Sequence, residues 1–230
     1  MNIEEMHVTF RELAQQMGIQ TVRAILPENI DICLNVAIVD TVKEIISTTV
    51  GYYQNNDKVG RNNAAVSSIN GLRTLYKHET KQVDLSGKGT MIEPYNLNLD
   101  DSSVMIYVGF KVSYDGATLY DCRIIENEDL SNTIHDFCSR PTKEQPICVV
   151  YGNDNDININ FITGSKTSTK PTHVQYLYIK NPVTVYYDEE DDSNNVNCDL
   201  PTYLHQDIVK RAVNVYLSSI GALSSNKNKD

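Results

Sequence analysis

Hydrophobic residues recur at steps of three and four near the start of the chain, which predicts helices over about 2–17 and 27–50. Pro27 has the fixed φ angle that suits a first helical turn, and Asp31 lies near the positive end of the helix dipole. A weaker repeat predicts a third helix over about 61–78. The three apolar stripes contain Ile3, Met6, Phe10, Leu13 and Met17; Ile30, Leu34, Ala37, Val42 and Ile45; and Ala65, Ile69, Leu72 and Tyr76.

From residue 81 the hydrophobic period becomes two residues, which is typical of half-buried strands. The alternation is clearest over Val104–Val112, and Asp115-Gly116 predicts a type I′ hairpin turn into a strand over Thr118–Ile125. A short helix is expected over Glu128–Cys138, with Phe137 in phase with its apolar side. The further strands are expected at Ile147–Tyr151, Asp156–Thr163, His173–Lys180 and Val183–Tyr187.

The acidic run Asp188–Asp192 indicates a solvated linker that binds cations loosely or, more simply, stays a soluble loop. A last helix begins at Leu200-Pro201 and carries Leu204, Ile208, Ala212, Val215 and Ile220 on one face. The predicted fold class is α+β, with N-terminal and C-terminal helices packed with a central, mainly antiparallel β-region. The expected regions are 1–80 (helical), 81–187 (β-rich with a short inserted helix), 188–199 (acidic linker), 200–221 (a helix packing back on the helical region) and 222–230 (a flexible tail).

The composition narrows the possible partners. The 230 residues include 20 Lys and Arg against 30 Asp and Glu, so the net charge is −10. This charge argues against a general affinity for DNA, RNA or anionic lipid, which requires a basic face. No apolar stretch approaches the roughly 20 residues that span a bilayer, and the first residues lack the features of a signal peptide. We therefore expect a soluble protein made in a cytoplasm, with no membrane partner.

Catalytic signatures are incomplete in this sequence. Gly87-Lys88-Gly89 lacks the preceding glycine of a phosphate-binding loop, and Asp154, Asp156 and Asn158 lack the later ligands of a calcium loop. His135 and Cys138 stand three apart on a predicted helix, without a visible orienting group or oxyanion hole. The five cysteines match no zinc spacing, so we expect reduced thiols. The sequence thus predicts no enzyme, no metal and no cofactor.

Three ordered segments resemble a known family. The last third contains Tyr178-Ile179-Lys180-Asn181-Pro182 and then Cys198-Asp199-Leu200-Pro201, followed by His205, Ile208-Val209 and Ala212-Val213. The middle contains Arg123-Ile124-Ile125, Phe137, Pro141 and Pro146, and the early helix contains Leu34-Asn35-Val36-Ala37. In this order and spacing the chain resembles virion structural proteins of crAss-like tailed bacteriophages, which look like ring-forming proteins of the head-to-tail connector.

The resemblance implies a non-enzymatic ring subunit that lines the DNA passage and joins the portal to the tail. It implies a twelve-fold ring, with the portal protein and neighbouring ring or tail proteins as partners, and a place in the virion after synthesis in the bacterial host cytoplasm. DNA would pass an acidic lumen without sticking. The residues expected to matter for structure and assembly are Leu34, Asn35, Ala37, Pro182, Leu200, Pro201, Leu204, His205, Ile208, Val209 and Ala212.

Two other classes remain open from the sequence. A tail-associated receptor-binding or head-decoration protein would favour a β-dominated, repeat-rich trimer. A tail-associated hydrolase would need an acid pair or a metal site in a cleft. His205 is interpreted as a capping or packing histidine rather than a pH switch.

Overall fold

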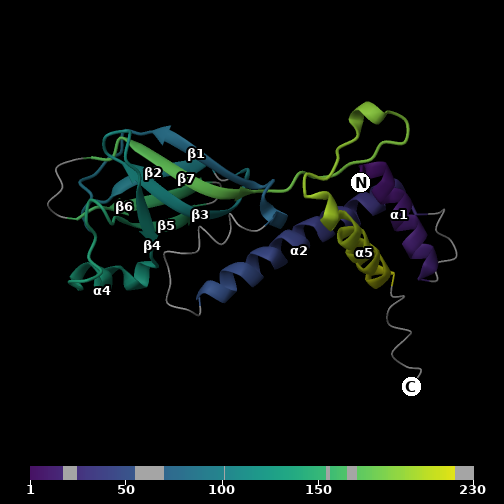
Figure 1. Ribbon diagram of the computed structural model, residues 1–230, viewed down its shortest axis with the longest axis horizontal. Coiled ribbons are helices and arrows are strands. Elements are labelled where there is room, and N and C mark those ends of the chain that lie inside the picture. Colours follow the sequence, from purple (N-terminus) through teal and green to yellow (C-terminus); the bar gives the residue numbers. More distant parts are fainter. Residues whose placement is uncertain (18–24, 55–69, 101, 154–155, 165–169, 221–230) are drawn as a thin grey trace, which may run out of the picture. The chain divides into compact units, whose positions relative to one another are not determined.

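The computed structural model describes residues 1–17, 25–54, 70–100, 102–153, 156–164 and 170–220 (Figure 1). Contacts divide the chain into a helical unit and a sheet unit. The helical unit joins α1 (Ile3–Gln16), α2 (Pro27–Gln54), the 3₁₀ turn η3 (Asn70–Leu72) and the chain from Pro182 through α5 (Thr202–Ser219). The sheet unit contains the described residues from Tyr76 to Asn181. The predicted α+β class is confirmed.

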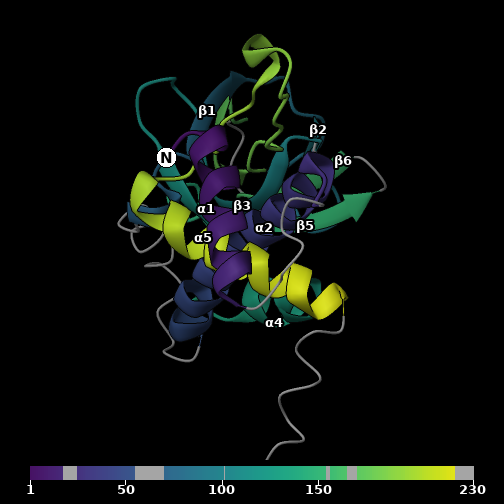
Figure 2. The same ribbon diagram turned by 90° about the vertical axis from the view of Figure 1, so that its right-hand side faces the viewer.

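The helical unit forms because each helix has a defined start and an apolar face. At the start of α1 the Asn2 side chain accepts the Glu5 N–H at 2.7 Å, and the Glu5 carboxylate accepts the Asn2 N–H at 3.0 Å. This reciprocal pair is a capping box. Pro27 opens α2, and Pro201 is the residue that precedes the first turn of α5. The three helices pack on one another (Figure 2).

The buried face of α5 differs from the predicted one. It is formed by His205, Ile208, Val209, Ala212, Val213 and Leu217. Ile208 and Ala212 were expected there, but Leu204 and Val215 are only half-buried and Ile220 is exposed. The buried face of α5 is therefore shifted by about one residue from the predicted face. The prediction missed the shift because the buried His205 is polar and does not contribute to a hydrophobic pattern.

The sheet unit contains seven strands in the order β1-β7-β3-β4-β5-β6-β2. The strands are β1 (Tyr76–Gln82), β2 (Tyr95–Asp100), β3 (Val104–Ser113), β4 (Tyr120–Ile124), β5 (Ile147–Asn153), β6 (Asp156–Ile162) and β7 (His173–Lys180). Every pairing is antiparallel except that of β4 with β5, so the mainly antiparallel sheet is confirmed.

Alternating side chains give the sheet two apolar faces. Along β5, Cys148 belongs to a large core that also contains Phe110, Phe161 and Val174. Val149 points to the opposite face, where a smaller cluster includes Leu130 of the short helix α4 (Leu130–His135). The 3₁₀ turn η4 (Asn127–Asp129) leads into α4. This two-sided burial is what a strand periodicity of two produces.

The helix predicted over 61–78 is wrong from Asn70 onward. Its part up to residue 69 lies outside the described residues, whereas Asn70–Leu72 is a 3₁₀ turn and β1 begins at Tyr76, before the expected change of period at 81. The side chains of β1 are almost all polar and exposed, so this edge strand carries no apolar alternation. β7 supplies its backbone partner in an unbroken register.

Three local predictions also need correction. β3 and β4 form the expected hairpin, but the connection is a longer loop in which the Asp115 carboxylate accepts the N–H groups of Ala117 at 2.9 Å and Thr118 at 2.8 Å. The short helix ends at His135, so Phe137 lies beyond it and is 80% exposed. The strand expected over Val183–Tyr187 is reduced to a single bridge between Tyr186 and Val196.

Candidate functional site

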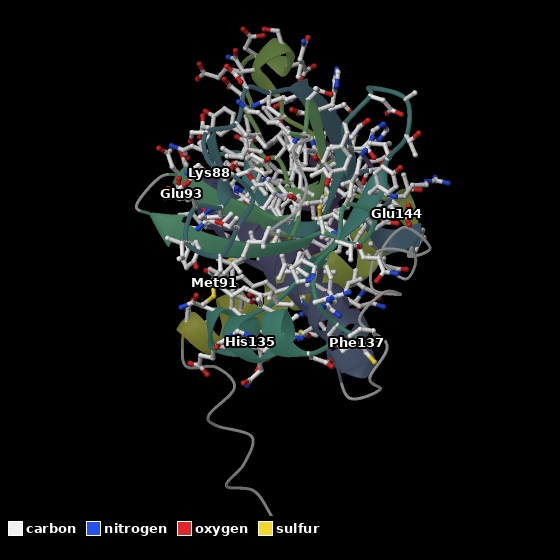
Figure 3. The ribbon with its side chains drawn as sticks, turned by 90° about the vertical axis from the view of Figure 1, so that its left-hand side faces the viewer. Lys88, Met91, Glu93, His135, Phe137 and Glu144 are labelled. Atoms are coloured by element: carbon white, nitrogen blue, oxygen red, sulfur yellow. The ribbon has the colours of Figure 1, made fainter. Side chains whose placement is uncertain are left out.

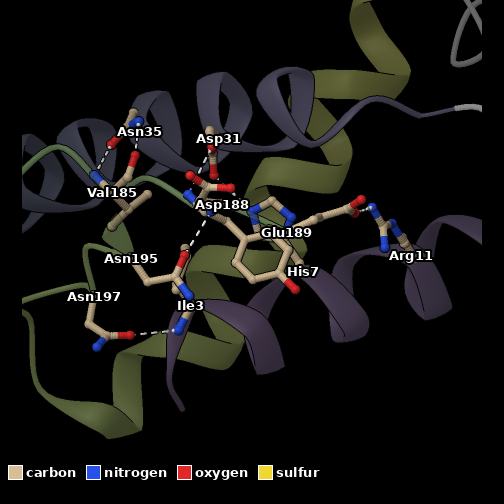
Figure 4. Close-up of polar contacts among 11 residues, drawn as sticks. Ile3, His7, Arg11, Asp31, Asn35, Val185, Asp188, Glu189, Asn195 and Asn197 are labelled. Carbon is tan, nitrogen blue, oxygen red and sulfur yellow. Dashed lines mark hydrogen bonds and ion pairs between the residues drawn. The ribbon is translucent and has the colours of Figure 1, made fainter. Parts of the chain in front are cut away.

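The segment 183–197 of the helical unit is held by two polar side chains of α2 (Figure 4). The Asn35 side-chain oxygen accepts the Val185 N–H at 2.8 Å, and its Nδ2 donates to the Val185 carbonyl at 3.0 Å. Asp31 accepts the Tyr187 N–H at 3.1 Å. Val185 itself is buried. The helix thus takes the place of a neighbouring strand for this segment.

The spacing of these residues explains the fit. Asp31 and Asn35 are four residues apart on a helix, which places them about 6 Å apart along its axis. Val185 and Tyr187 are two residues apart in extended chain, a repeat of roughly 6.6 Å with both N–H groups on the same side. The two spacings nearly match, so side chains one helical turn apart on α2 reach the N–H groups of alternate residues in the segment.

Asp31 also bridges to α1. Its second oxygen lies 2.7 Å from His7 Nε2, and both side chains are buried. The His7 ring packs against the Tyr187 ring with centroids 4.6 Å apart. The carboxylate therefore joins α1, α2 and the 183–197 segment. Asp31 was expected near the helix dipole, and its buried bridging contacts were not predicted.

The acidic run within this segment is exposed except for the half-buried Asp188, and it is not a simple linker. The Asp188 carboxylate accepts the Glu190 N–H at 2.9 Å and an Asn194 side-chain N–H at 3.0 Å, and these bonds lower its pKa, with the Asn194 contribution the larger. Asp191 accepts the Ser193 N–H at 2.9 Å at the start of the 3₁₀ turn η5 (Asp192–Asn194). Within the described ranges no three His, Cys, Asp or Glu side chains are grouped to hold a metal ion.

The 183–197 segment is attached to α1 at two points. The Asn197 side-chain oxygen accepts the Ile3 N–H at 2.8 Å, and Glu189 forms an exposed ion pair with Arg11 at 3.1 Å. Asn195 accepts the Asp188 N–H at 2.7 Å across the loop. The segment is therefore a bonded part of the helical unit.

His205 ties three parts of the helical unit together. Its buried ring places Nδ1 at 3.0 Å from the Met1 carbonyl oxygen and Nε2 at 2.8 Å from the Leu200 carbonyl oxygen. The ring therefore links the start of the chain, the end of the 183–200 region and α5. This placement agrees with a packing role for the histidine.

All eleven predicted assembly residues belong to the helical unit, and seven of them are fully buried. Asn35 is the half-buried residue that holds Val185, Pro201 precedes α5, and Pro182 and Leu204 are half-buried. The fully buried ones are Leu34, Ala37, Leu200, His205, Ile208, Val209 and Ala212. Any effect of these buried residues on assembly would therefore act through the folding of this unit.

The structure separates the catalytic candidates. His135 is the last residue of α4 and Asp136 is extended, so Cys138 does not share a helix with His135. Asp156 begins β6, and Asp154 lies outside the described residues. All five cysteines are free thiols.

The turn Gly87–Pro94, which we call the 87–94 loop, carries a surface that the sequence did not indicate. The backbone N–H of Lys88 donates to the Glu93 carbonyl at 2.9 Å, and the side chains of these two residues form an ion pair at 2.7 Å. Gly89 has a φ of +69° and its carbonyl accepts the Thr163 N–H at 3.0 Å. Met91 is exposed at the tip, and Ile92 is 91% exposed.

Phe137 lies near the same end of the sheet unit as the 87–94 loop. The loop contacts Thr163, and the next residue, Gly164, lies against the backbone of Pro141, which follows Phe137 closely. In Figure 3 the labelled Met91 and Phe137 lie on either side of His135. The Arg140 guanidinium lies 5.0 Å from the centre of the Phe137 ring. This end of the sheet unit therefore exposes large apolar side chains on segments whose backbone is held by hydrogen bonds.

No protein-family model matches this chain, and comparison with curated proteins finds no match. Among the described helices, none is both long enough and apolar enough to cross a bilayer.

Proposed function

We propose that this chain is a non-enzymatic virion structural protein, a ring-forming subunit of the head-to-tail connector of a tailed bacteriophage. In this role it would line the DNA passage, join the portal to the tail and reside in the virion after synthesis in the host cytoplasm.

The observation that carries the proposal is the 87–94 loop. An isoleucine that is 91% exposed is unfavourable in water, yet the loop around it is fixed by backbone bonds, an ion pair and two glycines with positive φ. Large apolar side chains presented on rigid backbone are typical of contact surfaces between proteins. Phe137 adds a second exposed apolar side chain near the same end.

Three further features support the same role. The net charge of −10 would keep anionic DNA from adhering to a channel wall. The helical unit bonds Met1 to α5 through His205 and holds the 183–197 segment on α2 through Asn35, which suits a subunit that bears load. The family resemblance of residues 178–213 and of the early helix points the same way.

Electron microscopy and native mass spectrometry of the purified protein test the proposal. We expect rings with a central hole, and a twelve-subunit ring has a mass of about 311 kDa (12 × 25.9 kDa). A trimer would favour the receptor-binding or decoration alternative. A strictly monomeric protein at all concentrations would contradict the ring proposal.

A further inference from the structure

We propose that the tip of the 87–94 loop of one copy inserts into an apolar groove in the sheet unit of a second copy. The inference rests on the proposed ring-forming function and identifies the contact between neighbouring subunits. Both surfaces belong to the sheet unit, so the contact is defined without reference to the helical unit.

The groove has a volume of about 330 Å³. Its walls are Met105, Ile106 and Tyr107 of β3, Ile124 of β4, Val150 of β5 and Ile157 of β6. The Phe110 ring, stacked on Tyr107 with centroids 5.6 Å apart, also contributes. Every one of these lining residues is hydrophobic or aromatic, and Ile106 and Ile124 are partly exposed.

The short length of β4 creates the groove. In the described sheet, β4 pairs with β3 over Phe110–Val112 and with β5 over Ile147–Cys148. Beyond that point β3 and β5 both continue without β4 between them, which leaves a gap in the sheet. Two register shifts in β3, between residues 104 and 109, lie along the same gap. Bulges of this kind redirect side chains and are frequent beside functional sites.

The loop and the groove lie at opposite ends of β6. Ile157, in the wall of the groove, is near the first residue of β6, whereas Thr163, which bonds to Gly89 of the loop, follows the last one. A strand of 7 residues separates the two ends by roughly 20 Å. Insertion between copies is therefore head to tail, and a repeated head-to-tail contact generates a ring when its rotation closes.

A second copy is the occupant because one chain carries both the exposed apolar tip and the apolar groove, at opposite ends of β6. Two copies that each carry −10 repel each other, so their contact requires surfaces without unpaired charge. The loop meets this requirement because Lys88 and Glu93 neutralise each other at its base and its tip is Met91-Ile92. The groove meets it because its lining is apolar. Two such side chains cover much less area than a stable isolated dimer needs, so we expect the contact to persist mainly in closed rings.

Cysteine cross-linking tests the contact directly. Ile92→Cys and Ile124→Cys are made separately, each with Cys138→Ser because Cys138 is exposed. The two purified variants are mixed, oxidised and separated under non-reducing conditions. We expect a covalent dimer in the mixture, little in either variant alone, and a ladder of multimers when one chain carries both cysteines.

Sedimentation velocity with Ile92→Asp gives an independent test. Ile92 is 91% exposed, so this variant should fold normally while its self-association weakens by at least about tenfold. Ile32→Asp is the matched control, because Ile32 is 61% exposed on α2 and should leave association unchanged.

The outcomes separate this inference from the proposed function. If the wild type forms rings that Ile92→Asp leaves intact, or if the doubly substituted chain cross-links only within itself, the loop-and-groove contact is refuted and the ring subunit stands. If the wild type never assembles and the mixture gives no dimer, both proposals fail.

Discussion

Replacing Asn35 by alanine should weaken the attachment of the 183–197 segment to α2. The substitution removes the bond from the Val185 N–H at 2.8 Å and the bond to its carbonyl at 3.0 Å. Because Val185 is buried, water replaces these partners poorly.

The magnitude follows from the two bonds. Each is worth about 1 kcal/mol net, and unsatisfied buried backbone groups raise the cost. Alanine gains about 0.5 kcal/mol over asparagine in helix propensity, which offsets part of the loss. The free energy of unfolding of the helical unit should therefore fall by about 2 kcal/mol.

Hydrogen exchange at Val185 and Tyr187, together with urea denaturation, measures the effect. A change of about 2 kcal/mol corresponds to roughly thirty-fold less protection of the Val185 amide when exchange follows local opening. Asn214→Ala is the matched control, because Asn214 is an exposed asparagine inside α5 and its loss should slightly stabilise the helix. Equal stability and unchanged amide protection in Asn35→Ala would refute the reasoning.

Three further predictions concern the loops and the sheet. Gly89→Ala forces a Cβ into the Tyr95 ring at a positive φ and should cost the sheet unit about 2 kcal/mol or more in thermal unfolding, whereas Gly152→Ala, with open space around it, should change little. The pKa of Glu79 is lowered mainly by hydrogen bonds from two tyrosine hydroxyls of β7. The ionised Glu79 therefore stabilises the fold above its unfolded pKa of about 4.3, and this stabilisation is lost as pH falls through the lower folded pKa. Glu79→Gln should therefore reduce the loss of stability at low pH, measured by denaturation at several pH values. Asp191→Ala removes the cap of η5 and should cost the helical unit about 0.5–1 kcal/mol by urea denaturation, while Glu190→Ala should be neutral.

The sequence predicts elements well where their signal is local. The period of 3.6 and the positions of Pro27 and Pro201 placed α1, α2 and α5 within a few residues, and alternation identified β3, β6 and β7. It fails at β1, because an exposed edge strand needs no apolar face and depends on its partner β7. It also overlooked β2, in spite of a clean buried and exposed alternation over only six residues.

The candidate sites depend on tertiary contacts that periodicity cannot see. Asn35 was expected to matter only through the family resemblance and Asp31 only through the helix dipole, and their bonds to Tyr187 and Val185 become visible only when that segment lies beside α2. A signal was nevertheless present, since a polar pair four residues apart within an apolar helix face often marks a buried polar contact. The exposure of Ile92 had no such signal, because a single apolar residue in a turn is common.

The order of elements along the chain has a consequence for synthesis. The helical unit needs α5, yet the whole sheet unit and the 183–197 segment are made between Gln54 and Thr202. At about 5–20 residues per second, the roughly 150 intervening residues take about 7 to 30 s. Throughout that interval the apolar faces of α1 and α2 lack their α5 partner on the ribosome. The nascent chain is therefore expected to fold its sheet unit first, while its first two helices remain without their third partner until α5 has been made.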